Sequence, residues 1–158
     1  MSCRVTVRIQ SEPFDTADEI TAISGGDNDV GAVVTFSGLC RDEAGTLHAL
    51  EIEHYPGMAE AEIGRIADAA AKRWPVTALT VVHRHGKIGI GEQIVLVVAA
   101  SRHRQAAFSA AEFLMDFLKS RAPFWKKEHR CDGTEGGWVD AKEADDAALS
   151  RWDRGKQG

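Results

Sequence analysis

The spacing of apolar and polar residues predicts strands in several parts of the chain. Residues 4–9 place Val5, Val7 and Ile9 on one face, which is typical of a half-buried strand. The segment 31–39 is β-branched and mostly apolar, as expected for a buried strand. The other segments with strand character are residues 47–55, 79–83, 93–100, 125–130 and 138–139.

Apolar residues repeated at helical spacing predict three helices. The first begins at Asp15 or Thr16, either of which can cap it, and ends near Ser24 before two glycines. The other two are predicted at residues 57–74 and 101–121. The segment 86–91, GKIGIG, contains three glycines but is followed by a strand pattern, so it predicts a turn rather than a phosphate-binding loop.

The mixed order of these elements predicts an α+β fold with a single domain over residues 1–142. Residues 143–158 are rich in charge and are expected to form a partly flexible tail with at most a short helix.

Composition excludes several classes of protein. The net charge of −5 over 158 residues opposes binding to nucleic acid or to an anionic membrane. The longest apolar run, residues 94–100, is far shorter than the ~20 residues that cross a bilayer. The odd number of cysteines, three, and their wide separation favour reduced thiols. We therefore expect a soluble, cytoplasmic protein.

Two clusters of basic residues stand out in this acidic chain. Lys119 and Arg121 lie at the end of the third predicted helix, Pro123 stops it, and Lys126 and Lys127 follow. Like charges repel, so an anionic ligand explains this cluster better than folding alone. We also expect Lys119 to be partly buried beside the apolar stripe, where it would be a usable base.

The second cluster, Arg102, His103 and Arg104, lies where the same helix should begin, with Ser101 as its expected N-cap. Free N–H groups and cations at a helix start favour phosphate binding, although these residues would otherwise extend into solvent or pair with acids. Arg41, in the polar loop after residues 31–39, is a further candidate for binding.

Other sites are weaker. Cys40 is either a buried structural cysteine, which we favour, or a thiol activated by Arg41 that works with His103. His83 and His85 lack further ligands at suitable spacing, so no metal site is expected.

Several blocks closely resemble the catalytic (large) subunit of molybdopterin synthase. They are GAVVTFSGLCRD (31–42), LEIEHYPGMAEAEI (50–63), RWPVTALTVVHRHGKIGIGE (73–92), SRHRQAAFSAAEFLMDFLKSRAPFWKKE (101–128) and GGWVDAK (136–142). The resemblance implies an α/β-hammerhead fold, with an antiparallel sheet and packed helices. It also implies a homodimer within a heterotetramer and no cofactor.

The implied activity is sulfur transfer in molybdenum cofactor biosynthesis. Such an enzyme converts cyclic pyranopterin monophosphate to molybdopterin, forming its dithiolene. The sulfur comes from the C-terminal thiocarboxylate of a small ubiquitin-like carrier subunit that ends in Gly-Gly. The alternative is a non-catalytic module that binds anions and docks the carrier.

The resemblance also implies roles for individual residues. Lys119 and Lys126 would be catalytic, the first as an acid or base and the second as a stabiliser of negative charge. The residues implied to bind substrate are Arg41, His103 and Arg104. Those implied to shape the pocket or contact the carrier tail are Phe36, Met115, Arg121, Pro123 and Lys127.

Overall fold

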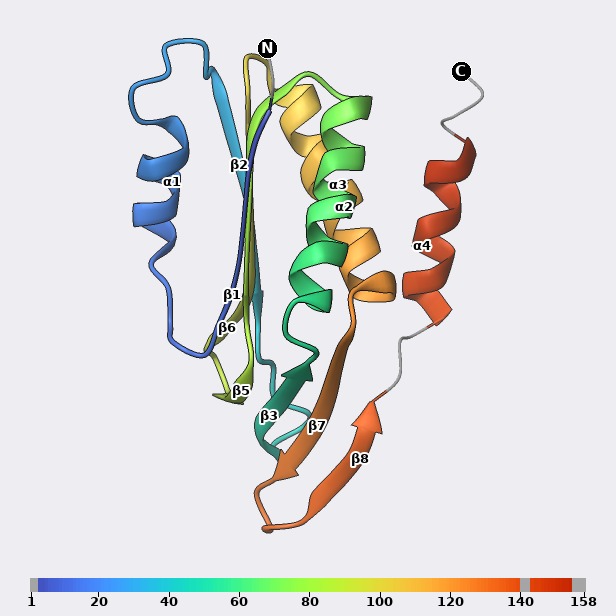
Figure 1. Ribbon diagram of the computed structural model, residues 1–158. Coiled ribbons are helices and arrows are strands. Elements are labelled where there is room, and N and C mark those ends of the chain that lie inside the picture. The colour runs from blue at the N-terminus through green and yellow to red at the C-terminus, as the bar shows by residue number, and fades with distance from the viewer. Residues whose placement is uncertain (1–2, 140–142, 155–158) are drawn as a thin grey trace.

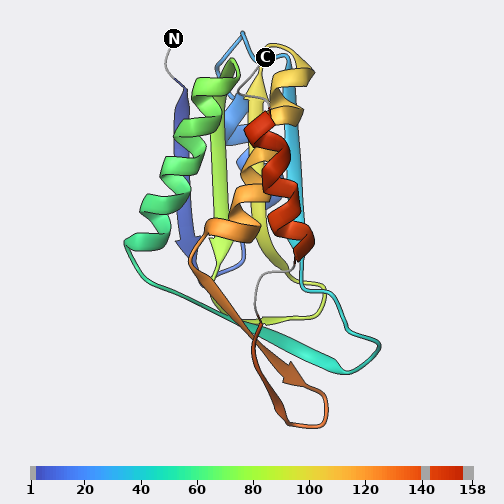
Figure 2. The same ribbon diagram turned by 90° about the vertical axis from the view of Figure 1, so that its right-hand side faces the viewer.

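The computed structural model describes residues 3–139 and 143–154, and within them the strands form two four-stranded sheets. The first sheet has the order β1 (Arg4–Gln10), β4 (Val76–Arg84), β6 (Gln93–Ser101), β2 (Ala32–Leu39). The second has the order β5 (Gly86–Gly89), β3 (Leu47–His54), β7 (Phe124–Arg130), β8 (Glu135–Val139). It extends from one end of the first sheet (Figures 1 and 2).

Helices cover both faces of the first sheet. α1 (Thr16–Ser24) lies on one face, and α2 (Met58–Arg73) and α3 (Arg104–Arg121) lie side by side on the other (Figure 1). α4 (Glu143–Arg154) packs outside them, against α3. The central strands β4 and β6 are buried along almost their whole length, which explains their continuous apolar sequences.

The predicted α+β class is confirmed, with one change in strand direction. β1 pairs with β4 in parallel, from Arg4 opposite Ala78 to Gln10 opposite Arg84, while the other pairings are antiparallel. Parallel neighbours need a long crossover, and the chain between β1 and β4 provides one that includes two helices.

The glycine-containing segment after β4 differs from the turn predicted for it. Gly86–Gly89 forms β5 and pairs with β3, so that Ile88 lies opposite Leu50. Ile88 is fully buried, and this burial favours a strand over the turn that the glycines suggest. The predicted turn was therefore wrong for Gly86–Gly89 and correct for Ile90 and Gly91, which connect β5 to β6. The segment is followed by a strand and not by a helix, in agreement with the rejection of a phosphate loop.

The start of α3 also differs from the prediction. Its N-cap is His103, because Ser101 continues β6 and pairs with both Ala32 and Val76. The Ser101 carbonyl accepts a hydrogen bond from the Gly31 N–H at 2.9 Å, and its hydroxyl donates to the His103 carbonyl. The two sheet pairings keep Ser101 extended, so it does not cap the helix.

Pro123 separates α3 from β7 as predicted, since α3 ends at Arg121 and the strand begins at Phe124. This turn brings the first residues of β7 back toward the first sheet. α4 lies within the segment predicted to be a partly flexible tail, and the domain boundary at residue 142 falls outside the described residues. Among the described helices, none is long and apolar enough to span a membrane.

Candidate active site

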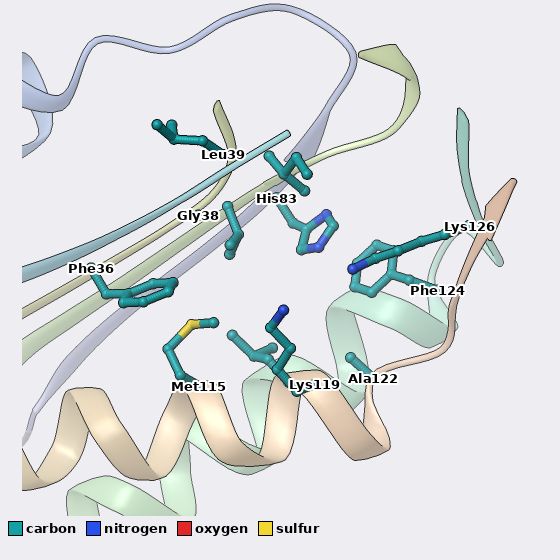
Figure 3. Close-up of a pocket in the computed structure, with 12 residues that line it drawn as sticks. Phe36, Gly38, Leu39, His83, Met115, Lys119, Ala122, Phe124 and Lys126 are labelled. Carbon is teal, nitrogen blue, oxygen red and sulfur yellow. The ribbon is translucent and has the colours of Figure 1, made fainter. Parts of the chain in front are cut away.

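A cavity lies where the end of α3, the start of β7 and the first sheet meet (Figure 3). Its walls are mainly apolar, and they include Phe36, Met115, Leu118 and Phe124. Two lysines and one histidine supply the charged or polar side chains, namely Lys119, Lys126 and His83. The elements that build it are separate in sequence, so only the folded chain assembles it.

Lys119 and Lys126 reach this cavity from different elements. Lys119 lies in the last turn of α3, and Lys126 is the third residue of β7. The prediction that Lys119 is partly buried was wrong: it is exposed at the mouth of the cavity, whereas Lys126 is half-buried. Figure 3 shows both side chains directed into the same hollow, beside the His83 ring. No Asp or Glu lines the cavity among the described residues, and an anion bound between the two ammonium groups would be attracted by both.

His83 is held rigidly at the wall of the cavity. It is only 6% exposed, and its ring stacks on Phe124 at 3.8 Å between centroids and 11° between planes. Its Nδ1 lies 2.8 Å from the Arg84 carbonyl oxygen. Burial lowers the pKa of His83 to about 3, with further lowering by the nearby Lys126, so the imidazole is neutral at neutral pH.

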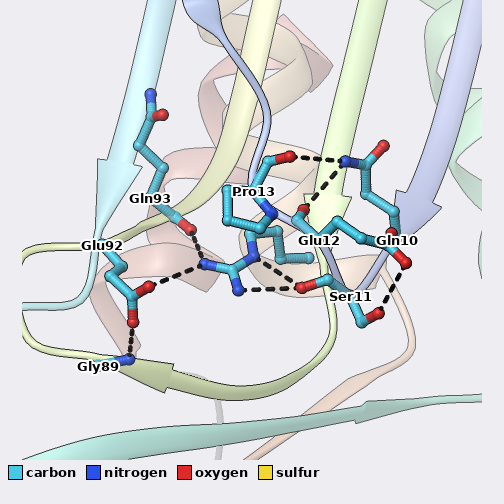
Figure 4. A network of polar contacts seen from close by, with 8 residues as sticks. Gln10, Ser11, Glu12, Pro13, Gly89, Glu92 and Gln93 are labelled. Atoms are coloured by element: carbon cyan, nitrogen blue, oxygen red, sulfur yellow. Dashed lines mark hydrogen bonds and ion pairs between the residues drawn. The ribbon is translucent and has the colours of Figure 1, made fainter.

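Arg84 is anchored in turn by contacts with Ser11, Glu92 and Gln93, which Figure 4 shows. Its guanidinium donates to the Ser11 carbonyl at 2.9 and 3.1 Å and to the Gln93 carbonyl at 3.4 Å, and it pairs with Glu92 at 3.7 Å. These contacts fix the backbone at Arg84, and with it the carbonyl that meets His83.

The second basic cluster lies in a separate hollow. His103 and Arg104 line it together with Arg102 and Phe108, at the other end of α3. Arg104 begins α3 and Lys119 lies in its last turn, so these two residues are separated by roughly 22 Å along the helix axis. One chain therefore does not bring the two basic clusters together.

Arg41 and Lys127 do not line the cavity. The Arg41 side chain is 76% exposed and pairs with Glu43 at 3.5 Å. Lys127 follows Lys126 on β7 and so points to the opposite face of the strand, where its Nζ lies 2.7 Å from Glu135 and 5.7 Å from the centre of the Trp138 ring. The hydrogen bond to Glu135 raises the pKa of Lys127.

Of the remaining candidates, Phe36 and Met115 line the cavity, whereas Arg121 borders a different hollow beside α4. Pro123 shapes the turn but does not line the cavity itself. Sequence reasoning missed His83 as a member of the site. The signal was its place at the end of an apolar strand, but nothing local showed that Phe124 would stack on it.

Cys40 behaves as a structural residue. It is 1% exposed, and burial is the main reason that the pKa of its thiol is raised. A raised pKa disfavours the reactive thiolate, and His103 lies in the other hollow. The structure therefore does not support the thiol-enzyme alternative. No group of three or more metal-ligating side chains occurs in residues 3–139 and 143–154.

Comparison with known proteins identifies relatives of the chain. Residues 9–121 match the model of the MoaE protein family. The chain belongs to the MoaE family. A relative from Mesorhizobium japonicum, named molybdopterin synthase catalytic subunit, is 74% identical and covers 93% of this chain and 92% of its own. A relative of the same name from Rhizobium meliloti is 61% identical over 98% of this chain and 99% of its own.

Solved structures of members of the same family also resemble this chain. The molybdopterin biosynthesis MoaE protein from Burkholderia ambifaria is 45% identical, with a TM-score of 0.81 over 97% of this chain and 99% of that one. A molybdopterin synthase from Staphylococcus aureus is 32% identical, with a TM-score of 0.75 over 83% of this chain and 94% of that one. These likenesses confirm the family suggested by the sequence blocks, its α+β fold and the prediction of an enzyme.

Proposed function

We propose that this MoaE-family chain is the sulfurtransferase subunit that converts cyclic pyranopterin monophosphate to molybdopterin in the cytoplasm. The observation that carries the proposal is the cavity in which Lys119 and Lys126 converge between apolar walls. Ammonium groups suit a cyclic phosphate and a thiocarboxylate, both of which are anions. Apolar walls such as Phe36 and Met115 suit a flat ring system.

In this proposal the two lysines have different tasks. Lys119 exchanges protons at the reacting carbon, and Lys126 stabilises the negative charge that develops as sulfur is transferred. The chain does not supply the sulfur, which arrives as the thiocarboxylate of a small ubiquitin-like carrier ending in Gly-Gly. None of the three cysteines lines the cavity, in agreement with an external sulfur donor.

We further infer that two copies of the chain complete each site. His103 and Arg104 are too far along α3 to reach the lysines of their own chain. The cavity, however, includes Phe36 and Leu39 of β2, which is an edge strand of the first sheet. These two side chains are 40% and 53% exposed, so a second copy packed on this edge would place its residues beside the cavity.

The proposed assembly is a central homodimer with one carrier at each end. A complex of subunits 1 and 2 of molybdopterin-converting factor from Helicobacter pylori shares the fold, with a TM-score of 0.67 at 22% identity. That likeness is to the fold alone, and the Gly-Gly tail of the carrier remains part of our proposal.

Activity of single and mixed variants tests the function and the shared site. We expect Lys119→Ala to lower single-turnover formation of product from thiocarboxylated carrier and the cyclic precursor by about 10²–10⁴-fold. Arg104→Ala alone should weaken precursor binding. If two copies share each site, about one quarter of all sites should be intact when the two variants are mixed in equal amounts and form dimers at random.

The outcomes separate the alternatives. Wild-type turnover by Lys119→Ala would reject the catalytic role of that residue. Binding of the carrier without any product from the wild-type protein would favour a non-catalytic docking module. Absence of recovery in mixed dimers of demonstrated composition would place His103 and Arg104 outside the shared site.

A further inference from the structure

We infer that His83 is a specificity-determining residue of the cavity, and that its Nε2 accepts a hydrogen bond from an N–H or O–H group of the ligand held between Lys119 and Lys126. This inference deepens the proposed function and rests on it. The expected source of the donor is the ring system of the precursor, and the other source with the same chemistry is a backbone amide of the carrier tail.

The tautomer of His83 follows from its contact with Arg84. A carbonyl oxygen only accepts hydrogen bonds, so the 2.8 Å contact with the Arg84 carbonyl requires the proton to be on Nδ1. In the neutral ring, Nε2 then carries a lone pair and no proton. Because Arg84 is anchored by Ser11, Gln93 and Glu92, the carbonyl that selects this tautomer is held in place.

The ring has little freedom to move. Phe124 lies flat against it at 3.8 Å, and His83 keeps 6% of its surface exposed while lining the cavity. A ring fixed by a stack on one face and a hydrogen bond at one edge presents its other nitrogen in a defined direction. Such preorganisation is what a residue that orients a ligand needs.

The other polar side chains of the cavity cannot perform this task. An ammonium group donates three hydrogen bonds and accepts none, so Lys119 and Lys126 recognise only the anionic part of a ligand. Among the described residues that line the cavity, no other side chain is a hydrogen-bond acceptor of comparable strength. A carboxylate in the place of His83 would accept hydrogen bonds but would repel the anion, whereas a neutral imidazole does not.

His83 is not suited to act as the general base. Efficient proton transfer at neutral pH needs a group with a pKa near the working pH, whereas burial holds the pKa of His83 at about 3. The residue therefore orients the ligand and discriminates against ligands that lack the donor.

Nitrogen NMR of the wild-type protein tests the tautomer without any turnover. With ¹⁵N-labelled histidine, we expect His83 to show a protonated Nδ1 and an unprotonated Nε2 at neutral pH. Addition of the precursor alone should shift the Nε2 signal, and addition of the carrier tail alone should leave it unchanged. A proton on Nε2 in the ligand-free protein would overturn the inference. A shift caused by the tail alone would assign the donor to the carrier and overturn the assignment to the precursor.

Three substitutions provide the matched functional test. His83→Asn keeps a donor for the Arg84 carbonyl but loses the distal acceptor, His83→Gln retains an acceptor near Nε2, and His83→Phe keeps only the stack on Phe124. We expect Asn and Phe to raise the Kd for the precursor by about fivefold to tenfold, and Gln to restore part of the affinity. Carrier affinity should stay at the wild-type value.

Equal precursor affinity in the wild type, His83→Asn and His83→Gln would refute the inference. Because the assay measures binding, it separates a failure of this inference from a failure of the proposed chemistry. If precursor binds in the predicted order but no product forms, only the proposed function is wrong. If a variant does not fold, the NMR measurement on the wild-type protein still decides.

Discussion

Truncation of Trp152 should loosen α4 from the body of the protein. The Trp152 indole Nε1 donates to Asp116 Oδ2 at 2.6 Å, and its ring makes edge contacts with Trp74 and Phe113, each at 5.4 Å between centroids. The Arg73 guanidinium lies 5.7 Å from the Trp152 ring and also donates to the Trp152 carbonyl at 3.0 Å. The indole therefore joins α4 to both α2 and α3.

The magnitude follows from these contacts. Aromatic pairs contribute about 0.5–1.5 kcal/mol each beyond burial, an exposed cation–π contact about 0.5–1, and a hydrogen bond to a charged group about 1.5–3. Trp152 is only partly buried, so we expect Trp152→Ala to lower the free energy of unfolding by roughly 3 kcal/mol. For a chain of this size, that corresponds to a fall in Tm of about 6–12 °C.

Trp152→Phe is the matched control. It keeps most ring contacts and loses only the indole donor to Asp116, so it should lose about 1–2 kcal/mol. Calorimetry and chemical denaturation of the wild type and both variants measure these differences. If Trp152→Ala has the same Tm and free energy of unfolding as the wild type, α4 does not pack against α2 and α3 in solution. The segment is then the flexible tail that the sequence predicted.

Three further outcomes are expected. Gly31→Ala should destabilise the protein by about 1–3 kcal/mol, because a Cβ there would collide with the Arg102 carbonyl. Gly64→Ala, in an open helical position, should be neutral or stabilising by up to ~1 kcal/mol. Urea denaturation of both variants measures the difference, and an equal loss of stability in the two would contradict this prediction. The folded-state pKa of His83, about 3, lies below its unfolded value of about 6.5, so the unfolded chain takes up this proton first as pH falls. Stability should therefore decline from about pH 6.5 toward pH 3, by an upper limit on the order of 5 kcal/mol, and His83→Phe should remove that part of the slope in urea melts. Cys40→Ser should retain product formation, and complete loss of turnover in a folded variant would revive the thiol alternative.

Most elements of the fold could be predicted from local patterns in the sequence. The strand at residues 4–9, the helix capped by Asp15 and the end of α3 before Pro123 all depend on side-chain spacing or on backbone restrictions near each residue. The family resemblance also directed attention to Lys119 and Lys126, which the structure places beside one cavity.

The misassigned segments depend on partners distant in sequence. Gly86–Gly89 becomes a strand because Ile88 is buried opposite Leu50, and Ser101 stays extended because two strands pair with it. Local propensity favoured a turn and a helix cap at these positions. Pairing across the sheets outweighed those preferences, as tertiary contacts commonly do.

The sequence alone thus determined which residues carry positive charge and which segments are helical or extended, because charge and periodicity are local properties. The predicted helix already placed His103 and Arg104 at the opposite end from Lys119, but only the tertiary structure decided that they line a hollow separate from the cavity of Lys119 and Lys126. It alone also placed His83 against Phe124, at the wall of the cavity. Both outcomes depend on how sheets and helices pack, and packing joins residues whose separation along the chain carries no signal of their contact.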